Sequence, residues 1–75
     1  MGSISDFNRK AATGGAPAAR LYCKEWSSEI DAKGKELSDK LRGNKIDRAV
    51  YNIRRLALNK EAQELNDCIQ KLNKQ

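Results

Sequence analysis

The spacing of the apolar residues constrains this chain most, because it follows the period of an α-helix over two long segments. In the first segment a small or apolar residue recurs at every third or fourth position: Ala19, Cys23, Trp26, Ile30, Gly34, Leu37 and Leu41. Such steps keep side chains on one face of a helix, which turns about 100° per residue. Pro17 suits the first turn of a helix, where its missing N–H is not needed. The spacing therefore predicts a helix over residues 17–42.

The second segment has the same period but carries two apolar faces. The first face is formed by Ile46, Ala49, Val50, Ile53, Leu56 and Ala57. The second face is formed by Leu58, Ala62, Leu65, Ile69 and Leu72. Since the two faces are about 110° apart around the helix axis, we predict a single helix over residues 45–73 that contacts two different neighbours.

A short break separates the two predicted helices. Gly43 suits the left-handed residue that follows a helix. Asn44 is predicted to cap the second helix, with Asp47 in the position of a capping-box partner. Because a break of about two residues turns the second helix back along the first, we predict an all-α fold. In this fold residues 17–75 form an antiparallel helical hairpin.

Pairing across such a turn assigns a partner to each apolar face of the second helix. Val50 lies opposite Leu37, which predicts that the first face packs on the first helix. The second face has no such match, because Trp26 would lie opposite Glu61. We therefore predict that the second face is an oligomer interface, which completes the hairpin as a bundle or coiled coil. The alternative is a bend near Leu58 that keeps both faces on one partner.

Residues 1–16 are predicted to be an N-terminal arm. Ile4, Phe7 and Ala11 share one face of a short helix, and the pair of glycines that follows ends it. A helix this short is marginal in water unless it packs against another surface. The arm is therefore either mobile or a docking arm that uses Ile4, Phe7 and Ala11.

The composition argues against catalysis and against a bound metal or cofactor. The chain has no histidine, which removes the commonest general base and the commonest metal ligand. Its two cysteines, Cys23 and Cys68, form no CxxC pair. The predicted pairing keeps them beyond disulfide reach, so both are predicted to be core residues. We expect no enzyme activity, no cofactor and no small-molecule substrate.

The sequence also bears on the cellular location. It contains neither an apolar run as long as a membrane span nor an apolar signal segment near its start. We therefore expect no membrane partner. The chain is expected to be soluble and intracellular (cytoplasmic), or to be part of a larger particle.

The net charge of +5 is concentrated around the predicted turn and the start of the second helix. This region forms a candidate surface for an anionic partner: Arg42, Lys45, Arg48, Asn52 and Arg55. We expect a non-enzymatic helical interaction or assembly protein. It would self-associate through the second half of the second helix and present the hairpin tip and arm to a protein partner. The alternative is a small basic helical regulator that binds nucleic acid through its Arg48 and Arg55 face.

Overall fold

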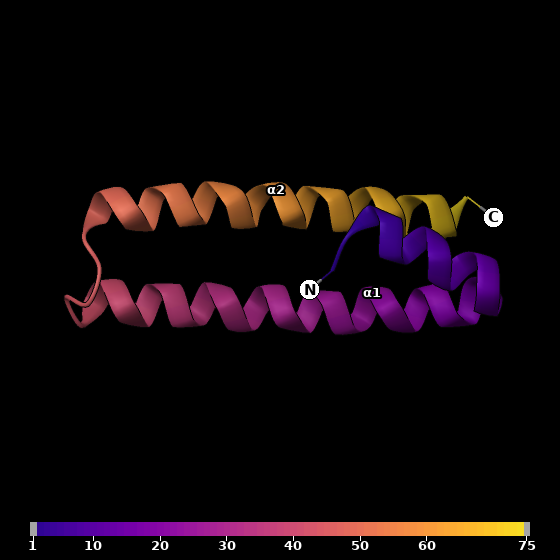
Figure 1. The fold of residues 1–75 in the computed structure, drawn as a ribbon, viewed down its shortest axis with the longest axis horizontal. Coiled ribbons are helices and arrows are strands. Elements are labelled where there is room, and N and C mark those ends of the chain that lie inside the picture. The colour runs from indigo at the N-terminus through magenta and orange to yellow at the C-terminus, as the bar shows by residue number, and fades with distance from the viewer. Residues whose placement is uncertain (1, 75) are drawn as a thin grey trace.

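The computed structural model describes residues 2–74 and consists of two antiparallel helices, α1 (Ile4–Arg42) and α2 (Arg48–Asn73) (Figure 1). No strand occurs within the described range. The predicted all-α helical hairpin is therefore confirmed, whereas its completion by oligomerisation stays a prediction. Between residues 2 and 74, neither helix has the length and apolar character that crossing a membrane requires.

α1 consists of two helical stretches joined at a sharp break. Gly15 has φ 72° and ψ −167°, a region of backbone space that is open almost only to glycine. Pro17 follows and cannot donate a backbone hydrogen bond across the break. Figure 1 shows the result: the N-terminal segment (residues 4–14) folds back beside the rest of α1. The glycine pair predicted this break.

The main core lies where the N-terminal segment, the long part of α1 and the C-terminal half of α2 meet. We call its buried residues the core cluster: Phe7, Ala19, Cys23, Trp26, Leu65, Cys68 and Leu72. Trp26 is 1% exposed. Its indole Nε1–H donates to Oε1 of Glu61, at 2.8 Å. Phe7 is buried in this cluster, so the arm that the sequence left as mobile or docked lies docked on its own chain.

The connection between the helices differs from the predicted two-residue turn. α2 begins at Arg48 instead of Lys45, and its N-cap is Asp47, whose carboxylate accepts a hydrogen bond from the backbone N–H of Val50 at 2.8 Å. Asn44, predicted to be the cap, instead takes the left-handed conformation with φ 58°, while Gly43 has φ −84°. The longer connection changes both the register and the rotation of α2 relative to α1.

This change reverses the predicted roles of the two apolar faces of α2. Leu58 packs beside Gly34 of α1, and Leu65 belongs to the core cluster, so the second face points into the molecule. On the first face, Ile53 and Leu56 are each 69% exposed. The physical reason is length, because the second face runs through the whole C-terminal half of α2, whereas the first face ends at Ala57. Packing the second face inward buries more apolar surface.

Candidate interaction surface

An unpartnered apolar stripe runs along the tip half of α2. We call it the outer stripe: Ala49, Ile53, Leu56 and Ala57. All four residues are exposed, and the two large side chains are each 69% exposed. Ile53 is about 140° around the helix from the buried Leu58, so the stripe lies on the side of α2 that faces away from α1. These four residues belong to the first apolar face predicted for this helix, whose other two members, Ile46 and Val50, are half-buried.

The half of α2 that carries the outer stripe is rich in basic residues. From Arg48 to Lys60 the chain has four basic residues and no acidic one; the other two are Arg54 and Arg55. All four are exposed. Within residues 2–74 the three ion pairs all join residues of α1, so none of these four cations is paired with a carboxylate. Arg48 and Arg55 lie on the far side of α2 from Ile53, about 140° and 160° around the helix. Arg54 is about 100° from Ile53, and Lys60 continues the line of the stripe.

The predicted anionic-partner surface stays on the outside of the molecule. Arg42, Lys45, Arg48, Asn52 and Arg55 are all exposed. Arg42 is held at the end of α1 by Asp39, at 3.5 Å. Arg55 lies across the hairpin, because its Nη1 is 3.2 Å from the point where a Cβ on Gly34 would stand. The glycine thus makes room for Arg55 and Leu58 at the helix crossing.

The predicted oligomer interface lies mostly inside the monomer. Leu58, Leu65 and Leu72 are buried, Ala62 is half-buried, and Ile69 is exposed at the edge of the core. The expectation that these residues form a free ridge is therefore wrong. It failed because the N-terminal segment and α1 together cover them, which a hairpin of two helices could not do. Ile69 lines a shallow groove of about 390 Å³ beside Arg20 and Lys24.

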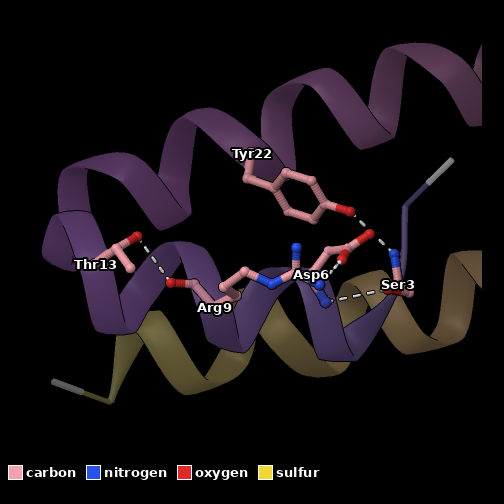
Figure 2. A network of polar contacts seen from close by, with 5 residues as sticks. All are labelled: Ser3, Asp6, Arg9, Thr13 and Tyr22. Atoms are coloured by element: carbon pink, nitrogen blue, oxygen red, sulfur yellow. Dashed lines mark hydrogen bonds and ion pairs between the residues drawn. The ribbon is translucent and has the colours of Figure 1, made fainter.

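The predicted docking arm is held by its own chain (Figure 2). The Ser3 hydroxyl caps the N-terminal segment by accepting from the backbone N–H of Asp6 at 3.1 Å, and Asp6 pairs with Arg9 at 2.8 Å. The backbone N–H of Ser3 donates to the Tyr22 hydroxyl at 3.1 Å. Thr13 closes the other end of the segment by donating to the Arg9 carbonyl at 2.9 Å.

Among the three candidate arm residues, only Ile4 is exposed. Phe7 is buried and Ala11 is half-buried against the core cluster. Tyr22 is not among the residues predicted to hold the arm, although its position three residues after Ala19 and four before Trp26 puts it beside the apolar face of the first helix. Burial raises the pKa of Tyr22 above its ordinary value, so the phenol stays protonated where it meets the arm.

The two cysteines are buried and free. Burial raises the pKa of both thiols, and the neighbouring Cys68 raises the pKa of Cys23 further. Both side chains belong to the core cluster, where Cys68 lies near Cys23 across the two helices. In the described part of the chain no group of three or more potential ligands gathers to hold a metal ion. Because their pKa values are raised, the thiols of Cys23 and Cys68 hold little thiolate and are poor nucleophiles.

Comparisons with protein-family models, with curated proteins and with solved structures find no match to this chain.

Proposed function

We propose that this chain is a non-enzymatic helical interaction protein that presents the outer stripe at the hairpin tip to a protein partner. The observation that carries the proposal is the exposure of Ile53 and Leu56, each 69%, on one side of a helix whose opposite side already holds the hairpin together. Single exposed apolar residues are ordinary on a protein surface. Here two large ones are neighbours on the same helical face and continue into Ala49 and Ala57.

Self-association through the second half of α2 is the less favourable arrangement. Leu58, Leu65 and Leu72 would have to leave their contacts within the monomer before a second copy could contact them. The outer stripe needs no such rearrangement, because it is exposed in the folded chain. The proposed interaction therefore uses the first half of α2, and the arm contributes by stabilising the hairpin.

The experiment that tests the proposal is affinity capture from the native source with identification of the retained protein. We expect one protein to be retained by the wild-type chain and lost with the double variant Ile53→Ser, Leu56→Ser. The matched control is Leu21→Ser, since Leu21 is 57% exposed at the other end of the hairpin. Retention that is unchanged in the double variant, or that disappears on nuclease treatment, would contradict the proposal.

A second candidate function is nucleic-acid binding through the Arg48 and Arg55 face of α2. Arg48, Asn52 and Asn59 are exposed on one side of α2, and Arg48 has no ion-pair partner within residues 2–74. Contacts to phosphates would make binding fall steeply as salt rises. Replacing Arg48 and Arg55 by Ala should lower both the affinity for DNA or RNA and its salt dependence. Absence of binding at low salt would eliminate this function.

A further inference from the structure

A groove lies where the C-terminal end of α2 packs beside α1. Its volume is about 390 Å³, which falls within the range of about 300–1,000 Å³ that small-molecule sites in proteins usually have. Cys23, Ile69 and Leu72 contribute apolar surface to it. Cys23 and Leu72 are buried core residues, and Ile69 is 37% exposed. An apolar group placed in the groove therefore leaves water without any rearrangement of the core.

Two cations stand on the α1 side of the groove. Arg20 and Lys24 both line it and are about one helical turn apart. Both are exposed, and neither belongs to the three ion pairs found within residues 2–74. No carboxylate of the described residues lines the groove. Burial raises the pKa of the Cys23 thiol, which therefore stays neutral and adds no negative charge. The groove combines an apolar surface with a positive wall.

The N-terminal segment leaves this side of the hairpin open. It meets α1 at Tyr22, whose hydroxyl accepts a hydrogen bond from the backbone N–H of Ser3. Tyr22 is about 160° around α1 from Arg20, and none of residues 4–14 lines the groove. The chain therefore covers its core on the Tyr22 side of α1, whereas the groove on the Arg20 side reaches Cys23 and Leu72.

We propose that this groove binds a small amphipathic carboxylate, of the class of a free medium-chain fatty acid. The hydrocarbon chain lies on Ile69 and Leu72. The carboxylate accepts charge-assisted hydrogen bonds from the Arg20 guanidinium and the Lys24 ammonium group. The ligand is bound and not converted, so the site is compatible with a non-enzymatic chain. The groove is separate from the outer stripe, and the inference goes beyond the proposed interaction function.

Other occupants use only part of the groove. Inorganic phosphate would engage Arg20 and Lys24 but would leave the apolar surface in water. A partner helix anchors itself through apolar residues spread over two turns or more, whereas Ile69 and Leu72 span only about 4.5 Å along α2. A single apolar chain with one anionic end uses both the apolar surface and the two cations.

The test uses decanoate as the probe, below its micelle concentration and at neutral pH, where the carboxylate is ionised. Two matched probes carry a similar hydrocarbon chain on a different head group: decanol is neutral, and decyltrimethylammonium is cationic. Binding to the full chain is followed by amide NMR spectra, because these report which residues respond to the ligand. Each titration is repeated at high salt.

We expect decanoate to shift the amide signals of Ser27, Ile69 and Leu72, with an affinity that falls as salt rises. Decanol should bind about tenfold more weakly, because it has no charge to pair with the two cations. Decyltrimethylammonium should leave these signals unchanged, since its head group is repelled by the positive wall.

Three variants separate the roles of charge and apolar surface. Arg20→Gln, Lys24→Gln should lower the affinity for decanoate about tenfold and remove its salt dependence. The matched control Arg54→Gln, Lys60→Gln removes the same two residue types outside the groove and should bind like the wild type. Ile69→Ser should weaken binding at low and high salt alike. Since all five positions are exposed, circular dichroism should show that the three variants remain folded.

Several results would overturn the inference. Decanoate that fails to bind below its micelle concentration, or that binds no better than decanol or acetate, would remove the role of the charge or of the chain. Shifts confined to amides outside the groove would place the ligand elsewhere. A wild-type dimer in sedimentation equilibrium that Ile69→Ser dissociates would make a second copy the occupant. Binding to phosphatidylglycerol vesicles through Arg20 and Lys24, without binding of decanoate, would make a membrane surface the partner.

Discussion

The observed packing of α2 predicts that one chemical change has very different effects at two of its leucines. Leu65 is 6% exposed and belongs to the core cluster, whereas Leu56 is 69% exposed on the outer stripe. Replacing each by Ala removes the same atoms from the same helix. Any difference in the free energy of unfolding therefore reports which face of α2 is buried.

The magnitudes follow from the two environments. Removing a buried leucine side chain costs about 2–5 kcal/mol, from lost transfer free energy and the cavity left behind, so we expect about 3 kcal/mol for Leu65→Ala. A chain of this length has a total stability of about 4–11 kcal/mol, of which this is a large share. Leu56→Ala should change stability by less than about 0.5 kcal/mol, since little contact is lost and alanine favours the helix at least as well as leucine.

Urea unfolding followed by circular dichroism and by Trp26 fluorescence measures both variants. Each titration is run at two protein concentrations, because a midpoint that moves with concentration reports an oligomer. A loss at Leu56 equal to or larger than that at Leu65 would refute the observed packing. That result would instead support the shorter turn, in which the face containing Leu56 packs on α1.

Three further predictions concern the core and its polar contacts. Phe7→Ala should lower stability by about 3 kcal/mol and expose the amides of the N-terminal segment to hydrogen exchange; unchanged exchange would mean that Phe7 does not hold the segment. Glu61→Leu should lower the free energy of unfolding by about 1–3 kcal/mol, because the buried indole N–H of Trp26 loses its acceptor. Glu61→Gln keeps an acceptor and should lower it less. Equal urea midpoints for the two variants would argue against the hydrogen bond. Burial raises the pKa of Cys23 and Cys68 above the ordinary 9.0, so the folded chain keeps protons that the unfolded chain releases. The contribution of the two thiols to the free energy of unfolding is therefore complete below pH 9.0 and is lost as pH rises above it. The urea midpoint should drop between about pH 7 and pH 10 by more in the wild type than in the Cys23→Ala, Cys68→Ala variant, and an equal drop in both would contradict this.

The helices themselves could be predicted because their signals are local. Apolar residues at steps of three and four defined both helices, and the glycine pair defined the break in α1. The cap of α2 was harder, because Asn44 and Asp47 are both good N-cap residues and stand three positions apart. The sequence offers no local reason to prefer one. The structure uses Asp47, and the extra residues in the connection alter the rotation of the whole helix.

The partner of each face depends on contacts that are distant in the sequence. By apolar spacing alone, Trp26 opposite Glu61 is a mismatch, yet the structure joins the two by a hydrogen bond from the indole N–H. A tryptophan has an apolar ring and a polar donor, so a carboxylate at its edge is compatible with burial. Phe7 adds a third helical segment to this end of the hairpin. Neither contact follows from the period of one helix.

The presence of two apolar faces on α2 is independent of which one packs inward. A hairpin with one partner helix can bury one face over the tip half, and the other must stay in water. Folding alone gives no reason for Ile53 and Leu56, since alanine at both positions would form the same helix at least as readily and keep the same core. Isoleucine is also a weaker helix former than alanine. In the proposed function, these two large aliphatic side chains on the outer face serve a contact with another protein. A double alanine variant that kept full stability but lost that contact would separate folding from function.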